Sequence, residues 1–268
     1  MEFFSDEFRH EAIIKTTPYG RFLVNDDLVC KEVGAGGFVD PYLQPIFDKF
    51  IDSESIVLDV GAHCGFHSVY FSKIAKGVFA FEPQRHVFHQ LCGNLFLNNC
   101  FNVSPLNLAL SDIECRMTVL LPHDHVAWGG DRYINYDECG NSGSLSVCKN
   151  PNGTIQGVFI DKFNFEKVDF IKIDAQGAEM DILMGGFKTI TECRPYFTFE
   201  YSWVVGIYEH GIKKLINYIR SQLKYEVLCL SREKFEFLAI PGEKADEVLK
   251  QFIYHWDAKG RFFVLNGS

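Results

Sequence analysis

Several features are missing from this 268-residue sequence, and each absence excludes a class of protein. No stretch approaches the roughly 18 consecutive apolar residues of a membrane-spanning helix, so we expect no membrane span. The nine cysteines are scattered and include no C-x-x-C pair, which argues against a disulfide framework or a zinc site and indicates a reducing compartment. The first residues lack the basic and apolar regions of a signal peptide. We therefore expect a cytoplasmic protein with free thiols.

Basic residues are also few. Lysine and arginine number 26 against 35 aspartates and glutamates, which gives a formal net charge of -9. Because contacts to phosphate groups need clustered basic side chains, we expect no nucleic-acid partner. The sequence contains no internal repeat, and 47% of its residues are hydrophobic, including 26 phenylalanines. A chain of this length can bury a sizeable interior, so we expect one large domain or a core with additions.

One stretch carries most of the functional information. Residues 56–60 have the pattern of a buried strand that contains Asp59, and a turn with Gly61 and Gly65 follows before a helix. The next strand ends in Glu82. Glycine is needed where a backbone bends sharply or approaches a ligand closely, and a carboxylate at the end of the second strand is placed to hold ribose hydroxyls. The unit predicts a site for a nucleotide-type cofactor.

The spacing of the glycines distinguishes between cofactors. Dinucleotide-binding folds use G-x-G-x-x-G, which lets a pyrophosphate settle on a helix N-terminus. Here Asp59 precedes Gly61 by two residues, and Gly65 is the second glycine. An acid at this position repels a pyrophosphate but suits the cationic amino-acid end of S-adenosylmethionine, which we therefore expect in place of NAD. The other residues expected to bind the cofactor are His63, Phe66, His67, Ser68, Ala109, Ser111 and Asp112.

Strands and helices are predicted to alternate along the chain. Residues 19–33 alternate like a hairpin with its turn at Asn25-Asp26-Asp27, and a helix is expected after Asp40-Pro41. Residues 122–156 are polar and rich in glycine and asparagine, and their length favours a lid or binding loop. The remaining strands are expected at 56–60, 78–82, 103–109, 116–121, 168–174, 196–200, 226–230 and 235–240, with helices at 66–75, 85–98, 178–184 and 211–223.

This order of elements predicts the fold class. Alternating strands and helices describe an α/β, doubly wound, mostly parallel sheet. The short connection at residues 231–234 suits an antiparallel hairpin of the last strands, because parallel neighbours need a crossover. We expect residues 1–54 to form an N-terminal hairpin and helix extension, and residues 55–268 to form the cofactor-binding domain.

Five motifs occur together in a recognisable order. They are Asp59-Val60-Gly61-Ala62 with Gly65 and Ser68, Phe81-Glu82-Pro83, Ala109-Leu110-Ser111-Asp112, Asn141-Ser142-Gly143-Ser144 and Lys172-Ile173-Asp174-Ala175-Gln176-Gly177-Ala178-Glu179. Over roughly residues 55–201 the chain resembles the FkbM-type methyltransferase family. The resemblance implies a class I, Rossmann-like methyltransferase with a seven-stranded sheet, which uses S-adenosylmethionine to methylate hydroxyls of sugars, glycans or natural products. The family usually has Glu where this chain has Gln176 and commonly Asn where it has His63.

Three residues near the strand ends are candidates for catalysis. Methyl transfer to a hydroxyl needs a positioned acceptor and a group that takes its proton, and ligands of open α/β sheets lie beyond the carboxyl ends of the strands. Asp174 is the first candidate for the general base or for orienting the acceptor, with a helix cap as its structural alternative. Glu200 is the second, with an ion pair to Lys172 or Arg194 as its alternative. Lys172 shares a strand face with Asp174.

The long polar segment contains His123 and His125, whose side chains are of a type that often takes part in catalysis. A histidine can accept a proton near neutral pH, and His125 is therefore a further catalytic candidate. The two histidines could also hold a divalent metal together with Asp174 or Glu200. The structural alternative is a pair of solvated loop side chains.

The sequence therefore predicts an O-methyltransferase acting on a hydroxyl of a sugar or glycan residue. One alternative is an RNA ribose or natural-product methyltransferase, although the acidic chain and Glu200 argue against the RNA enzyme. A second is a cofactor-binding regulatory protein without turnover, which is motivated by Gln176. A third is a domain that works beside a glycosyltransferase. The acceptor, the metal dependence and the oligomeric state stay open.

Overall fold

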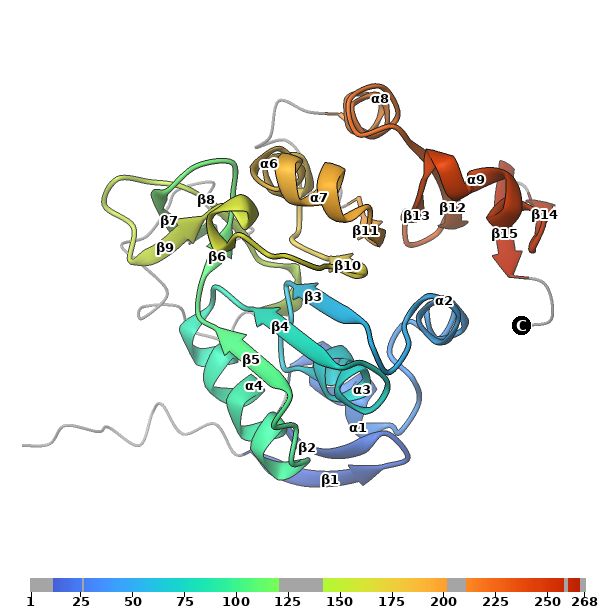
Figure 1. Ribbon diagram of the computed structural model, residues 1–268. Coiled ribbons are helices and arrows are strands. Elements are labelled where there is room, and N and C mark those ends of the chain that lie inside the picture. The colour runs from blue at the N-terminus through green and yellow to red at the C-terminus, as the bar shows by residue number, and fades with distance from the viewer. Residues whose placement is uncertain (1–11, 26, 121–141, 202–210, 258–259, 266–268) are drawn as a thin grey trace, which may run out of the picture.

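The computed structural model describes residues 12–25, 27–120, 142–201, 211–257 and 260–265 (Figure 1). A seven-stranded sheet forms its centre, and its spatial order is β12 (Tyr225–Ser231), β13 (Glu236–Pro241), β11 (Tyr196–Glu200), β10 (Phe170–Ile173), β3 (Ile56–Val60), β4 (Gly77–Phe81) and β5 (Val103–Leu106). Strands β11, β10, β3, β4 and β5 are parallel, whereas β13 is antiparallel to both of its neighbours. The mostly parallel α/β sheet expected from the sequence is confirmed.

Helices cover both faces of this sheet, and the strand sequences explain why. Successive side chains of a strand point to opposite faces. In β3, Val57 packs into one hydrophobic cluster and Leu58 into the other, and Phe170 and Ile171 of β10 divide in the same way. One cluster includes side chains of α2 (Gln44–Phe50), α3 (Phe66–Ile74), α4 (Arg85–Leu97) and α9 (Gly242–Leu249), and the other those of α6 (Glu179–Gly185), α7 (Phe187–Cys193) and α8 (Ile212–Ser221). Figure 1 shows α3 and α4 on the opposite side of β3 and β10 from α6 and α7.

The N-terminal hairpin lies earlier in the chain than the sequence predicts. Its strands are β1 (Ile13–Thr17) and β2 (Gly20–Val24), and the expected turn at Asn25-Asp26-Asp27 is wrong. Asp27 begins α1 (Leu28–Gly34), where its side chain accepts hydrogen bonds from the backbone nitrogens of Val29 and Cys30 at 2.9 and 3.5 Å. Aspartate is favoured both in turns and at helix N-caps, so local sequence does not separate the two.

The helix expected directly after Asp40-Pro41 begins later. Helix α2 starts at Gln44, and Pro45 is the proline in its first turn. Asp40 has a left-handed backbone, with φ of 52°, and does not cap the helix. The apolar side chains Ile46 and Phe47 of α2 are buried against the sheet.

A second, four-stranded sheet occupies part of the segment expected to be a loop. It consists of β6 (Ala109–Leu110), β9 (Ile155–Val158), β7 (Cys115–Leu120) and β8 (Ser146–Lys149), in that spatial order. Residues 142–156 therefore contain β8, the first two residues of β9 and the short 3-10 helix η3 (Ser142–Ser144), while 121–141 lie outside the described residues. Strands β8 and β9 are four residues long and both pair with β7. Their formation depends on this tertiary pairing, which a local sequence pattern does not predict.

The remaining described elements complete the chain. Another 3-10 helix, η4 (Ile160–Phe163), precedes β10, and a C-terminal hairpin pairs β14 (Phe252–Asp257) with β15 (Gly260–Leu265). Among the described residues, no helix combines the length and the apolar character that crossing a bilayer would require.

Candidate functional site

The turn after β3 has the backbone that its glycines predict. Gly61 and Gly65 have φ values of 76° and 84°, and His63 between them is also left-handed at 50°. A Cβ atom on Gly61 would lie 1.8 Å from the backbone oxygen of Asp174, and one on Gly65 would lie 2.4 Å from Cδ1 of Leu91. Gly61 is therefore required by its close contact with the backbone at Asp174, and Gly65 is favoured by its left-handed backbone. The turn lies directly against the end of β10.

A cavity of about 280 Å³ opens beside this turn. Its wall includes α1, the residues after η3 and the carboxyl ends of β3, β4, β10 and β11. The sequence-predicted residues in its lining are Gly61, His63, Phe66, His67, Glu82, Ala109, Lys172, Asp174 and Glu200. The predicted residues that do not line it are Asp59, Gly65, Ser68, Ser111 and Asp112. The structure therefore brings nine of the cofactor and catalytic candidates to one cavity.

Asp59 lies beneath the turn and not at the cavity surface. Its side chain is fully buried, and Oδ2 accepts a hydrogen bond of 2.6 Å from the hydroxyl of Ser68. Its other oxygen, Oδ1, lies 3.9 Å from Nζ of Lys172. Asp59 and Ser68 thus tie β3 to α3, and any effect of Asp59 on a ligand is electrostatic.

Ser111 and Asp112 are engaged away from the cavity. The Ser111 backbone nitrogen donates to Val158 at 2.8 Å and so continues the small sheet. Asp112 forms an ion pair of 2.6 Å with Lys149.

Glu82 follows β4 and is almost completely buried. Its Oε2 accepts a hydrogen bond of 2.9 Å from the backbone nitrogen of His63, and its Oε1 accepts one of 2.8 Å from that of Gln84. Burial raises the pKa of Glu82 to about 7, against the effect of these two hydrogen bonds. Each carboxylate oxygen has a second lone pair, so Glu82 can accept further hydrogen bonds from a ligand in the cavity.

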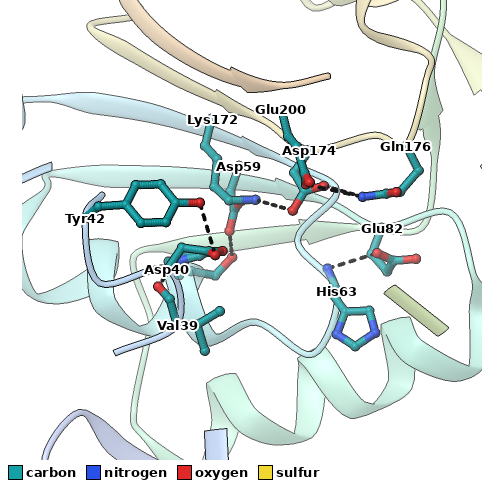
Figure 2. A network of polar contacts seen from close by, with 12 residues as sticks. Val39, Asp40, Tyr42, Asp59, His63, Glu82, Lys172, Asp174, Gln176 and Glu200 are labelled. Carbon is teal, nitrogen blue, oxygen red and sulfur yellow. Dashed lines mark hydrogen bonds and ion pairs between the residues drawn. The ribbon is translucent and has the colours of Figure 1, made fainter. Parts of the chain in front are cut away.

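The catalytic candidates form one polar network (Figure 2). Lys172 on β10 is 4% exposed, and its Nζ lies 3.3 Å from Oδ2 of Asp174. Gln176 donates from Nε2 to Oδ1 of Asp174 at 2.9 Å and to Oε2 of Glu200 at 3.5 Å. Gln176 has a left-handed backbone, with φ of 51°. The Gln176 amide therefore links the carboxyl groups of Asp174 and Glu200.

These groups differ in their protonation. Burial acts to raise the pKa of Asp174, but Lys172 and the Gln176 amide hold it below its ordinary value. Burial, followed by the negative charge of Asp174, raises the pKa of Glu200 to about 8. Burial opposes the charge of Lys172, but Asp174 and Asp59 raise its pKa. At neutral pH the network thus contains an ammonium, a carboxylate and a protonated carboxyl group.

Three residues near this network, namely Asp40, Tyr42 and Glu236, were not identified as site residues from the sequence. Asp40 accepts a hydrogen bond of 3.2 Å from the hydroxyl of Tyr42, and burial raises the pKa of Asp40. Glu236 on β13 is 5% exposed and lies opposite Glu200 in the strand register. The register of an antiparallel strand is set by tertiary pairing, so no local signal points to Glu236.

The histidine predictions have different outcomes. His67 is buried, its Nε2 lies 3.1 Å from the backbone oxygen of Val39, and burial lowers its pKa to about 3. His67 is therefore neutral and lines the cavity. His123 and His125 lie outside the described residues. Within the described part of the chain, no group of three metal-ligating side chains is present.

Comparison with known proteins identifies a family. A model of the family described as "Methyltransferase FkbM domain" matches residues 59–227. No curated protein matches the chain.

Solved structures with related architecture include methyltransferases. An FkbM methyltransferase from Methylobacillus flagellatus has a TM-score of 0.48 and 18% identity, covering 70% of this chain and 44% of that one. An rRNA methylase from Streptococcus thermophilus has a TM-score of 0.43 and 11% identity, covering 73% and 90%. The chain thus spans less than half the length of the FkbM structure that it matches, and TM-scores below 0.5 add nothing to the family match.

Proposed function

Since this chain belongs to the FkbM methyltransferase family, we propose that it transfers the methyl group of S-adenosylmethionine to a hydroxyl of a sugar or glycan residue. The observation that carries this proposal is that Gln176 links Asp174 to Glu200 beside Lys172, at the strand ends that line the cavity. Methyl transfer to a hydroxyl requires a proton acceptor at such a place.

The residues of the cavity fit S-adenosylmethionine. The cofactor supplies a methyl group on a positively charged sulfonium. Glu82 has lone pairs for ribose hydroxyls, and the turn at Gly61 lets the backbone form one wall of the cavity. Asp174 supplies an ionised carboxylate at this wall, beside the ammonium of Lys172, and its remaining lone pairs can accept hydrogen bonds from the ammonium end of the cofactor.

Glu200 is the better proton acceptor of the two carboxyl groups. A general base works best when its pKa lies near the working pH, and the pKa of Glu200 is about 8. Asp174, which stays ionised, orients the acceptor hydroxyl and raises the pKa of its neighbour. Glu200 would take the proton of the acceptor hydroxyl, and S-adenosylmethionine, when bound, would supply the methyl group that replaces this proton on the oxygen. Lys172 holds Asp174 in place.

Gln176 is compatible with this mechanism. Its side chain donates to both carboxyl groups and takes no proton itself. The replacement of Glu by Gln therefore leaves the two groups that the mechanism uses, which favours an active enzyme over a regulatory protein without turnover. The net charge of -9 also favours a hydroxyl-rich, uncharged acceptor over a polyanionic RNA.

The first test is calorimetric titration of the protein with S-adenosylhomocysteine, with NADH as the control ligand. We expect micromolar binding of S-adenosylhomocysteine and none of NADH. In the Glu82→Gln variant, which retains the side-chain shape, we expect affinity to fall about tenfold because one charge-assisted acceptor is lost. Failure of the wild-type protein to bind S-adenosylhomocysteine would overturn the proposed cofactor.

Transfer of a labelled methyl group tests the acceptor. Free sugars, glycans, a polyphenol and a structured RNA are offered in parallel with labelled S-adenosylmethionine. We expect label in the sugar or glycan samples only. Label in the RNA alone would assign the enzyme to the ribose-methylating class instead.

A further inference from the structure

Ser142 lies against the cavity wall, and each of its polar groups has a partner. Its backbone nitrogen and its hydroxyl both donate to Oδ2 of Asp27, at 2.6 and 2.8 Å. Its carbonyl oxygen accepts a hydrogen bond of 3.0 Å from Nε2 of Gln84, and its hydroxyl oxygen lies 2.8 Å from Nε2 of His63. Ser142 is only 6% exposed. It therefore joins α1, the glycine turn and the residues after β4.

These contacts determine the tautomer of His63. Asp27 accepts four hydrogen bonds, from the backbone nitrogens of Val29 and Cys30 and from Ser142 twice. A carboxylate surrounded by donors is an acceptor, so the single hydroxyl proton of Ser142 points to it. The Ser142 oxygen can then only accept from the imidazole, and Nε2 of His63 carries the ring proton. Burial lowers the pKa of His63 and keeps the ring neutral.

Because of this tautomer, Nδ1 of His63 is a hydrogen-bond acceptor that has no donor within the described part of the chain. With its proton on Nε2, His63 presents a lone pair at Nδ1, which is buried and has no hydrogen-bond partner among the described residues. Oε1 of Gln84 is buried without a partner in the same way, and that side chain is 4% exposed. Its orientation is determined, because the carbonyl of Ser142 requires the NH₂ group. Buried acceptors without donors are costly.

Both acceptors belong to residues that line the cavity, next to Glu82. The backbone nitrogens of His63 and Gln84 donate to its two carboxylate oxygens. Figure 2 shows the imidazole of His63 extending from the turn away from Lys172 and Asp174. His63 and Gln84 therefore lie beside Glu82, and the imidazole of His63 is directed away from the proposed place of methyl transfer.

We propose that Ser142, held by Asp27, is a positioning residue that presents His63 Nδ1 and Gln84 Oε1 as hydrogen-bond acceptors to the adenosine half of the cofactor. This inference rests on the proposed function. Adenosine carries the required donors in its ribose hydroxyls and its 6-amino group. Asp27 and Ser142 touch no ligand themselves, and they act by fixing one ring tautomer and one amide orientation.

The tautomer is measured directly by long-range ¹H–¹⁵N NMR of the ¹⁵N-labelled full chain, with His63→Asn used to assign the ring. In the wild-type protein we expect a protonated Nε2 and an unprotonated Nδ1, and a change of the Nδ1 resonance when 5′-methylthioadenosine is added. In Ser142→Ala we expect both tautomers to be populated. A protonated Nδ1 in the ligand-free wild-type protein would overturn the inference, whatever the activity of the enzyme.

Affinity is the second measurement. S-adenosylhomocysteine and 5′-methylthioadenosine, which lacks the amino-acid group, are titrated into wild-type protein, Ser142→Ala and Ser221→Ala. Ser221 is an exposed serine on α8 and serves as the matched control. We expect Ser142→Ala to lose about tenfold in affinity for both ligands and Ser221→Ala to lose none.

The outcomes separate this inference from the proposed function. Unchanged affinity in Ser142→Ala, or a loss confined to S-adenosylhomocysteine, would overturn the adenosine assignment while the wild-type protein still binds the cofactor product. Failure of the wild-type protein to bind either ligand would instead remove the proposed cofactor, and the inference with it. If Ser142→Ala does not fold, the wild-type NMR experiment still decides the tautomer and the contact.

Discussion

Gly61 lies at the point where the turn after β3 meets the end of β10. No larger residue fits there, because a Cβ atom would overlap the backbone oxygen of Asp174 and the backbone φ is 76°. We expect Gly61→Ala to lower the free energy of unfolding by at least about 3 kcal/mol, since strain adds to the overlap. Chemical denaturation followed by circular dichroism measures this loss.

Gly37 provides the matched control for that substitution. It is exposed, and a Cβ atom there would meet nothing within 4 Å. Gly37→Ala should change the free energy of unfolding by no more than about 0.5 kcal/mol. Equal stability of the two variants would show that the turn and β10 are not packed as the structure has them.

The raised pKa of Glu200 leads to a prediction about how the activity depends on pH. A base acts only when deprotonated, and the pKa of Glu200 is about 8. With a sugar acceptor we therefore expect kcat to rise with pH and to level off above about 8. Glu200→Gln should lose most of the activity and all of this rise, whereas Glu226→Gln, an exposed glutamate on β12, should keep both. A rise that persists in Glu200→Gln would assign the proton acceptor to another residue.

At the scale of secondary-structure elements, asparagine side chains attach the N-terminal hairpin to α4. Asn98 accepts from the backbone nitrogen of Arg21 at 2.8 Å and donates to its oxygen at 2.7 Å, which extends the edge of β2. Asn94 is fully buried and accepts from Leu23 at 2.7 Å, and it donates to the oxygen of Cys64 at 2.7 Å. The same helix face therefore holds both the hairpin and the glycine turn.

Replacement of Asn98 tests this attachment. In Asn98→Ala we expect the amides of β2 to exchange with solvent about fivefold faster, because two hydrogen bonds at an exposed position are lost. Exchange in β3 should not change. Asn217→Ala, at an exposed position on α8, is the control and should leave β2 protected. Unchanged exchange in Asn98→Ala would mean that apolar packing alone holds the hairpin.

In the molecule as a whole, the acidic groups make folding depend on pH. Burial raises the pKa of Glu82 and of Glu179 to about 7, and that of Glu200 to about 8. At these three carboxyl groups the folded protein thus binds more protons than the unfolded chain from roughly pH 4.5 to 8. A raised carboxyl pKa contributes stability that is complete below the unfolded pKa and is lost as pH rises through the folded one.

We therefore expect the thermal midpoint to fall between pH 5.5 and pH 8.5. Repulsion from the net charge of -9 acts in the same direction. Differential scanning calorimetry in buffers of equal ionic strength measures this fall. Glu179→Gln should make it smaller, because one buried carboxyl group no longer titrates. A midpoint that rises over this range would contradict the protonation states assigned to the buried acids.

The sequence alone was sufficient for the central sheet. Strands β3, β4, β10 and β11 are mostly apolar because both of their faces are buried, and the glycine turn and Glu82 are local signals that follow β3 and β4. Short elements were not predictable in this way. Strands β8 and β9 have four residues each, and their partners are other strands of the small sheet. Asp27 was misassigned because its local preference suits a turn as well as a helix cap.

The candidate site likewise has some features that the local sequence predicts and others that depend on the tertiary structure. The sequence by itself determined which strand ends carry Glu82, Asp174 and Glu200, because period and spacing are local properties of the chain. Only the tertiary structure decided that Ser142 reaches Asp27, 115 residues away, and that Gln176 links two carboxyl groups from different strands. The tertiary structure also decided the protonation states of these carboxyl groups, since burial and neighbouring charge exist only in the folded chain.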